Sequence, residues 1–281
     1  MKFGLSLRNT GPGSSSEAIE AGAETAERLG WETVWTTDHV LVPGSAADEY
    51  GRTFEAIETL AWVGARHPRL KLGTSIIVVP QRNAVLLAKE LATLDVLSGG
   101  RVIAGAGVGW NETEFANLGA ADRFHRRGAY LDEAIRLWRH LWSGSTEPFH
   151  GVFHEFTDFV FGPLPIRGDR LPIVVGGSSP AALRRAGGLA DGYHATRATP
   201  NEMAQRIPVV RAAAEAAGRP APALSARMSV TTDLAAMLSN VRAFQGLGVE
   251  HLALVFSETE PAVLASAIER FDREVVKALD G

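Results

Sequence analysis

Residues 172–192 read PIVVGGSSPAALRRAGGLADG, and this stretch predicts one complete structural unit. A short β-branched run, Ile173–Val175, ends in two glycines and two serines, and Pro180 then opens a stretch of helical composition. β-Branched residues favour strands, and proline fits the first turn of a helix because its missing N–H would have no partner there. A second apolar run, Gly192–Thr196, follows directly. The stretch therefore predicts a strand, a tight turn, a helix and a second strand.

The same order of elements repeats along the chain. Short apolar runs alternate with stretches whose apolar residues have helical spacing, and glycines such as Gly30 and Gly218 fall where helices should end. Eight strand–helix units in 281 residues predict an α/β fold, the (β/α)8 or TIM barrel. An open doubly wound sheet is the alternative, although no GxGxxG motif follows the first strand. The expected strands are Phe3–Leu7, Thr33–Thr36, Leu72–Val79, Val102–Gly107, Ile173–Val175, Gly192–Thr196, Leu224–Val230 and His251–Phe256, and the expected helices lie near 16–29, 54–66, 83–97, 123–142, 180–190, 200–217, 234–247 and 261–279.

One interval is longer than a strand–helix unit needs. Between Gly107 and Ile173 the sequence predicts a long helix, Arg123–Trp142, and then a β-hairpin around Thr157–Asp158, where polar and apolar residues alternate. We expect this excursion, about residues 110–170, to follow the fourth strand and to help roof the C-terminal mouth of the barrel. No internal repeat or low-complexity linker divides the chain, so residues 1–281 are expected to form one domain.

Composition narrows the class of function. The chain has no cysteine, which excludes disulfides, thiolate nucleophiles and cysteine-bound metals and fits a reducing cytoplasm. Its net charge is −4, with basic residues scattered, so nucleic acid is not expected as a partner. The apolar runs are shorter than the roughly 20 residues that span a bilayer. The histidines show no metal-ligand spacing. We therefore expect a cytoplasmic protein that acts on small molecules without a metal or a membrane.

Two ionisable residues follow the second expected strand. Residues 33–40 read TVWTTDHV, and Asp38 and His39 come where the strand should reach the active-site face of a barrel. Histidine titrates near neutral pH, so His39 suits proton transfer or a hydrogen bond to a cofactor, and Asp38 could accept a hydrogen bond from an imidazole or fix a loop. The alternative interpretation is a capped strand end with a solvated histidine.

Three further motifs fall at neighbouring strand ends. Gly176, Gly177, Ser178 and Ser179 precede a helix, and their amide and hydroxyl groups at its positive end are typical of a phosphate site, although a serine-capped turn has the same pattern. Glycines at the end of the fourth strand leave bare backbone on which a flat ring could lie. The segment Gly73–Ser75 predicts a distorted strand. All of these motifs would share one face of the barrel.

Together these motifs resemble the luciferase-like flavin and deazaflavin oxidoreductases, the bacterial luciferase superfamily. The resemblance covers nearly the whole chain. Within the superfamily, the sequence is most similar to the branch that uses coenzyme F-420, an 8-hydroxy-5-deazaflavin. It rests on MKFGLSL from Met1, AERLGWETVWTTDHV up to Val40, GTSIIVVPQRN from Gly73, LATLDVLSGGRVIAGAGVGWNETEFANLG from Leu91 and LPIVVGGSSPAALRRAGGLADG from Leu171.

The resemblance implies roles for particular residues. His39 would bond a substrate hydroxyl or relay a proton beside the reactive ring, and Asp38 would orient it or contact the cofactor. Ser75 and Ile76 would form a non-prolyl cis peptide behind the ring. The other implied cofactor contacts are Gly107 and Val108, which would lie against the ring, and Gly176, Gly177, Ser178 and Ser179, which would hold the phosphate.

The implied activity is hydride transfer between F-420 and an unidentified small organic substrate. Two alternatives stay open: a monooxygenase that uses FMN from a separate reductase, and a non-catalytic flavin-binding protein. Trp110 and His194 are candidates for the substrate pocket, although each is also a plausible core residue. Glu112 and Glu114 follow the fourth strand, where one could act as an acid, although a solvated or arginine-paired glutamate is the simpler interpretation. We expect a homodimer, both from the resemblance and from exposed apolar helices.

Overall fold

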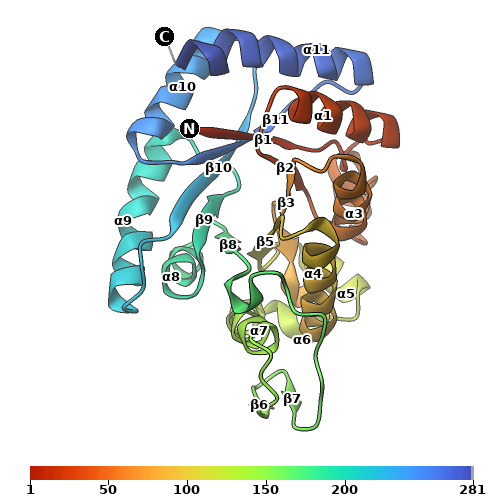
Figure 1. Ribbon diagram of the computed structural model, residues 1–281, viewed down its shortest axis with the longest axis vertical. Helices are drawn as coiled ribbons and strands as arrows, with labels where there is room; N and C mark the ends of the chain where they lie inside the picture. The colour runs from red at the N-terminus through yellow and green to blue at the C-terminus, as the bar shows by residue number, and fades with distance from the viewer. Residues whose placement is uncertain (280–281) are drawn as a thin grey trace.

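The computed structural model describes residues 1–279, and its centre is a closed barrel of parallel strands (Figure 1). The barrel strands are β1 (Lys2–Ser6), β2 (Thr33–Thr36), β3 (Lys71–Thr74), β4 (Ile77–Val78), β5 (Val102–Gly107), β8 (Ile173–Gly176), β9 (Gly192–Ala195), β10 (Ala223–Ser229) and β11 (His251–Val255). Their order is β3-β2-β1-β11-β10-β9-β8-β5, and β5 also pairs with β3, which closes the ring. The predicted TIM barrel is therefore confirmed.

Helices surround the barrel because each has one apolar face to bury against the strands (Figure 1). In α11, for example, Leu264, Ile268 and Phe271 are buried on one side. The last predicted helix ends at residue 271, where a wider π-type turn over 272–276 replaces it. No helix within residues 1–279 is long and apolar enough to cross a membrane. The surrounding helices are α1 (Ser16–Arg28), α3 (Ala56–Arg66), α4 (Ala84–Ser98), α7 (Arg127–Trp142), α8 (Pro180–Leu189), α9 (Pro200–Ala216), α10 (Leu234–Gly246) and α11 (Pro261–Phe271).

The third barrel strand is interrupted near its C-terminal end. A single strand was expected over Leu72–Val79, but Ser75 and Ile76 separate β3 from β4, and the peptide bond between them is cis. Here the hydroxyl of Thr74 replaces hydrogen bonds between the strand backbones: it donates to the carbonyl of Gly105 at 2.7 Å and accepts from the Gly105 N–H at 2.9 Å. Both the predicted distortion of this strand and the implied cis peptide are confirmed.

The excursion differs from its prediction in where the hairpin turns. It contains α5 (Glu112–Asn117), α6 (Ala121–Phe124) and a hairpin of β6 (Phe149–His150) with β7 (Glu155–Phe156). The turn is therefore at 151–154, and the predicted turn at Thr157–Asp158 is wrong. The reason is Glu133 on α7, whose carboxylate accepts hydrogen bonds from the backbone N–H groups of Val152, Phe153 and His154 at 2.5–3.0 Å.

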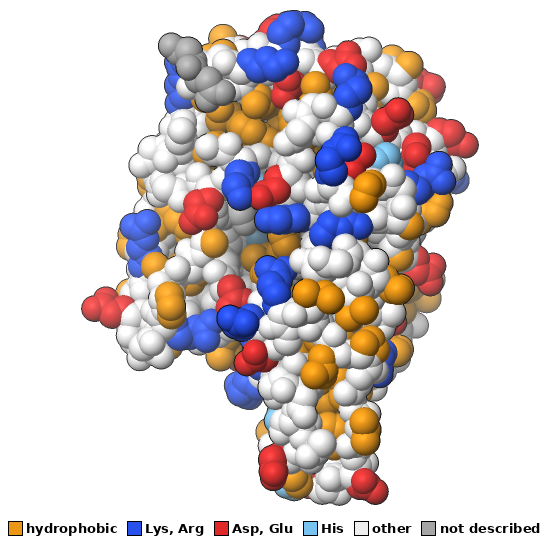
Figure 2. All heavy atoms as spheres, viewed as in Figure 1, with side chains coloured by type: hydrophobic (Ala, Val, Ile, Leu, Met, Phe, Trp, Pro, Cys, Tyr) orange, Lys and Arg blue, Asp and Glu red, His pale blue; other side chains and the backbone are white. Residues whose placement is uncertain are grey.

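The hairpin also does not roof the barrel mouth. It projects outward beyond α7, away from the ring of strands (Figure 1). The start of the excursion does reach the mouth, through Trp110 and a side chain of α5 described below. At the opposite ends of the strands, Glu32 contacts the ammonium groups of Lys2 at 2.7 Å and Lys71 at 3.0 Å. On the face drawn in Figure 2, basic side chains gather around the central hollow, with acidic side chains between some of them.

Candidate active site

His39 follows β2 and is held by a carboxylate from the excursion. Its Nδ1 lies 3.0 Å from Oε2 of Glu114, and Oε1 of Glu114 accepts a hydrogen bond from the Val40 N–H at 2.7 Å. Glu114 is 1% exposed and His39 is 9% exposed. Asn111 caps α5 and accepts from the Glu114 N–H at 3.2 Å, which fixes the start of this helix. Of the two ring nitrogens of His39, only Nδ1 has a partner within residues 1–279.

The charge of Glu114 decides the state of the imidazole. Burial alone would raise the pKa of Glu114, but the hydrogen bonds from His39 and Val40 outweigh burial and hold that pKa below its ordinary value. The carboxylate is therefore ionised near neutral pH and requires a proton on Nδ1 of His39. That arrangement leaves Nε2 to accept or return a proton at the barrel mouth.

Asp38 forms its hydrogen bonds with Val78 and Arg82 and not with His39. It is 3% exposed and accepts hydrogen bonds from the Val78 N–H at 2.8 Å and from Arg82 at 2.6 Å. Arg82 also pairs with Glu55 at 2.8 Å. The prediction that Asp38 orients His39 is wrong, because Glu114 does so. Asp38 instead ties the end of β2 to β4, beside the cis peptide.

The implied cofactor residues on three neighbouring strands come together. Ala106 of β5 pairs with Ile77 of β4 on one side and with Val175 of β8 on the other. The side chain of Ile76 fills the space above both glycines that end these strands. A Cβ at Gly107 would lie 1.8 Å from Cδ1 of Ile76, and one at Gly176 would lie 2.8 Å from it. The glycines therefore allow Ile76 to reach the mouth, where it and Val108 remain partly exposed.

The glycine–serine turn leads from β8 into α8. Gly177 has a φ of +114°, which favours glycine, and Ser178 and Ser179 are exposed. The hydroxyl of Ser179 accepts from the Ala182 N–H at 3.2 Å and so caps the helix. Tyr193 donates to the carbonyl of Gly177 at 2.9 Å and fixes the turn. The turn presents the positive end of a ten-residue helix at the mouth, and its phosphate role stays a prediction.

His194 lies inside the barrel and does not line a substrate pocket. Its ring is fully buried, with Nε2 2.9 Å from Oγ of Ser75 and Nδ1 2.8 Å from Oγ of Ser225, and it stacks on Trp35 at 4.6 Å between ring centroids. Burial lowers the pKa of His194 to about 3, so the ring is neutral. Its position supports Ser75 from beneath. Trp110, in contrast, is 60% exposed, and its ring centroid is 6.1 Å from that of His39.

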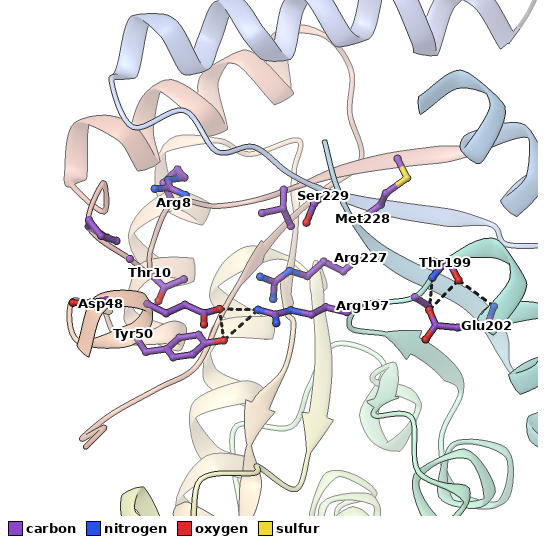
Figure 3. Close-up of a pocket in the computed structure, with 15 residues that line it drawn as sticks. Arg8, Thr10, Asp48, Tyr50, Arg197, Thr199, Glu202, Arg227, Met228 and Ser229 are labelled. Atoms are coloured by element: carbon purple, nitrogen blue, oxygen red, sulfur yellow. Dashed lines mark hydrogen bonds and ion pairs between the residues drawn. The ribbon is translucent and has the colours of Figure 1, made fainter. Parts of the chain in front are cut away.

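A pocket of about 770 Å³ opens at the barrel mouth next to Tyr50 (Figure 3). Tyr50 forms part of its wall, and the centroid of the Tyr50 ring is 4.0 Å from that of His39. The volume is typical of a site for a small organic molecule. Sequence reasoning missed this pocket. Its lining comes from four strand ends and from the segment before α3: Arg8, Thr10, Gly11, Pro12, Asp48, Glu49, Tyr50, Arg197, Ala198, Thr199, Glu202, Arg227, Met228, Ser229 and Val255.

Comparison with known proteins identifies the family. The model of the luciferase-like monooxygenase family matches residues 1–274. The chain belongs to that family. This luciferase-like protein is therefore an enzyme of the oxidoreductase class, as its strand-end motifs predicted.

The relatives of this luciferase-like protein include two dehydrogenases that use F-420. It is 31% identical over 255 residues to an F-420-dependent glucose-6-phosphate dehydrogenase from Kineococcus radiotolerans, covering 88% of this chain and 74% of the relative. It is 32% identical over 271 residues to one from Mycolicibacterium fortuitum, covering 92% and 79%. Among solved structures, an F-420-dependent secondary alcohol dehydrogenase has a TM-score of 0.82 at 19% identity, covering 98% of both chains. At 19% identity, this structural similarity shows the fold alone.

Proposed function

We propose that this protein is an F-420-dependent oxidoreductase, in which a hydride passes between the bound coenzyme and a small organic substrate. The observation that carries the proposal is the buried His39–Glu114 pair at the same barrel mouth as the cis peptide at Ser75–Ile76, beside a 770 Å³ pocket. The choice of F-420 is supported by the dehydrogenases to which the chain is 31–32% identical.

The mouth fits such a coenzyme in two places. Ile76 and Val108 offer partly exposed apolar surface for a flat ring, next to the bare backbone of Gly107. The hydroxyl of Ser178 and the N–H of Ala181 offer hydrogen-bond donors for a phosphate, since Pro180 has no N–H and that of Ala182 is bonded to Ser179. When bound there, the deazaflavin would supply the carbon that accepts or donates a hydride.

The side chains of the protein would handle the proton. With Glu114 ionised and Nδ1 of His39 protonated, Nε2 accepts the hydroxyl proton of an alcohol while the hydride leaves its carbon. In the reverse direction, the imidazolium returns that proton to the carbonyl oxygen. Glu114 stabilises the imidazolium that forms between these steps, because its carboxylate is already in contact with the ring.

A binding measurement tests the coenzyme. We expect micromolar binding of F-420 and weaker binding of FMN, followed by ligand fluorescence and by thermal unfolding. A ligand at 100 times its Kd adds about 2.7 kcal/mol to the free energy of unfolding. Ser178→Asp, which places a negative charge at the expected phosphate, should weaken F-420 binding by roughly tenfold or more. Tighter binding of FMN would indicate the monooxygenase alternative, and binding of neither would contradict the proposal.

The Glu114→Gln variant tests the proton relay. Glutamine keeps the shape but removes the charge that stabilises the imidazolium, so turnover should fall roughly tenfold to a hundredfold. The matched control is Glu112→Gln on the same helix, whose side chain is 64% exposed and only 3.6 Å from the exposed His125. Steady-state rates with F-420 at saturation provide the measurement. Equal rates for Glu114→Gln and the parent protein would remove Glu114 from the mechanism.

A further inference from the structure

The pocket next to Tyr50 contains two arginines that lack an acidic partner. Within residues 1–279, no carboxylate oxygen forms an ion pair with Arg8 or Arg227 inside the 4.0 Å limit. Arg8 has only a 3.4 Å contact with the carbonyl of Phe256, and its Nε is buried without a hydrogen bond. Arg227 lies 3.3 Å from the hydroxyl of Thr37 and 3.3 Å from the carbonyl of Ser75. Neutral oxygens therefore provide all the contacts of these two cations.

Three carboxylates line the pocket, and two of them are already in use, while the third, Asp48, forms no ion pair with Arg8 or Arg227. Glu49 pairs with Arg197 at 2.7 Å and also accepts from the Tyr50 hydroxyl at 2.6 Å. Glu202 accepts from the N–H of Thr199 at 2.8 Å, in the capping box of α9. Figure 3 shows both interactions as dashed lines, at some distance from Arg8. Neither Arg8 nor Arg227 therefore has a direct ion pair with a carboxylate that lines the pocket.

Holding these cations in the pocket is unfavourable for the protein alone. Burial lowers the pKa of both Arg8 and Arg227. The neighbouring charge of Arg197 lowers the pKa of Arg227 further. Figure 3 shows Arg227 and Arg197 extending side by side from neighbouring strand ends. A buried charge without a counter-ion is strongly disfavoured, and two like charges held together add to that penalty. An anionic ligand would reduce both the cost of burying these charges and the repulsion between them.

The location of Arg227 connects the pocket to the reaction site. Its guanidinium contacts the carbonyl of Ser75, the first residue of the cis peptide at which the coenzyme ring is expected. The pocket wall at Tyr50 lies against His39 on the other side. A molecule in the pocket would therefore contact two residues, Arg227 and Tyr50, that adjoin the expected ring position and His39 respectively.

We infer that the substrate carries an anionic group, a carboxylate or a phosphate ester, which Arg8 and Arg227 bind in this pocket. The inference rests on the proposed function and adds the chemical class of the substrate. Guanidinium groups match both anions because their planar N–H donors bind two oxygens at once. Arg197 is neutralised by Glu49 and serves as the adjoining wall. The reacting hydroxyl or carbonyl of the substrate then points toward His39.

An anion titration without coenzyme tests the pocket directly. The probes are inorganic phosphate and acetate, compared with chloride at equal ionic strength by calorimetry and thermal unfolding. We expect Arg8→Met and Arg227→Met each to weaken binding of the preferred anion by roughly tenfold to a hundredfold, and Arg227→Lys to retain part of it. The matched control is Arg219→Met, a partly buried arginine outside the pocket that lies 3.5 Å from Asp191. Anion binding that is equal in the parent protein and both Met variants would overturn the inference.

Coenzyme titration of the same variants separates the two proposals. An unchanged Kd for F-420 together with lost anion binding supports a substrate subsite. Loss of F-420 binding in Arg8→Met and Arg227→Met would show that the arginines hold the coenzyme instead, which overturns the inference and leaves the proposed function intact. If the parent protein binds no F-420, the proposed function fails, while the anion titration still decides the pocket. Within residues 1–279 Arg227 has no acidic partner, so Arg227→Met should keep or raise the melting temperature. If Arg227→Met is instead less stable than the parent protein, anion binding is compared between the parent protein and Arg227→Lys.

Discussion

Replacing His39 with alanine is expected to reduce turnover by roughly a hundredfold to ten-thousandfold, the range that a positioned general acid–base provides. The imidazole is the titratable group at the barrel mouth that Glu114 holds with one nitrogen free. Without it, the substrate proton must go to water. The Kd for F-420 should stay near that of the parent protein, because His39 contributes no phosphate contact. Single-turnover rates and coenzyme titration measure the two quantities separately.

The matched control is His125→Ala, since that side chain is 82% exposed and lies outside the pocket. A double variant sharpens the test. If Glu114 acts only through His39, then Glu114→Gln should cause no further loss of turnover in the His39→Ala background, because residues that act as a unit are not additive. Turnover by His39→Ala at the parent rate would contradict the role of His39, and a further loss in the double variant would give Glu114 a role of its own.

The barrel was predictable because its signals are local and repeated. The ranges of β2 and β5 match their expected strands at both ends. Apolar runs of fixed spacing, with proline at helix starts and glycine at helix ends, determine elements whatever their tertiary neighbours are. The interrupted third strand was also visible, through the small residues at Gly73–Ser75. The hairpin turn was not, because it depends on Glu133 from another element.

The partner of His39 shows why site geometry is harder to predict. Asp38 is adjacent in sequence, but neighbouring side chains in extended backbone point in opposite directions, so the two seldom meet. The structure brings in Glu114 from 75 residues away. Its burial arises from the packing of α5 on the mouth, which no periodicity in the sequence encodes. The arginine pocket has the same origin, since Arg8, Arg197 and Arg227 lie near the ends of three separate strands.

The second large effect concerns acid stability: lowering the pH from 7 to 5 should reduce the free energy of unfolding by about 4 kcal/mol through two buried histidines. Burial lowers the pKa of His194 to about 3 and that of His251 to about 4, against about 6.5 for each in the unfolded chain. Between these values and pH 6.5 the unfolded chain binds more protons than the folded protein, so stability falls as the pH falls. At pH 5 each histidine accounts for about 2 kcal/mol of the loss.

Contacts on the ring nitrogens explain why neither histidine is expected to charge within the fold. The indole N–H of Trp35 donates to Nε2 of His251 at 3.0 Å, so a proton there would set two donors against each other. Within residues 1–279, His194 lies between two hydroxyls and contacts no carboxylate. Urea unfolding at pH 7 and pH 5 measures the loss. His194→Gln and His251→Gln should each remove about half of it, whereas His125→Gln, at an exposed site, should remove none. A pH dependence that is the same in the parent and all three variants would show that other groups control acid stability.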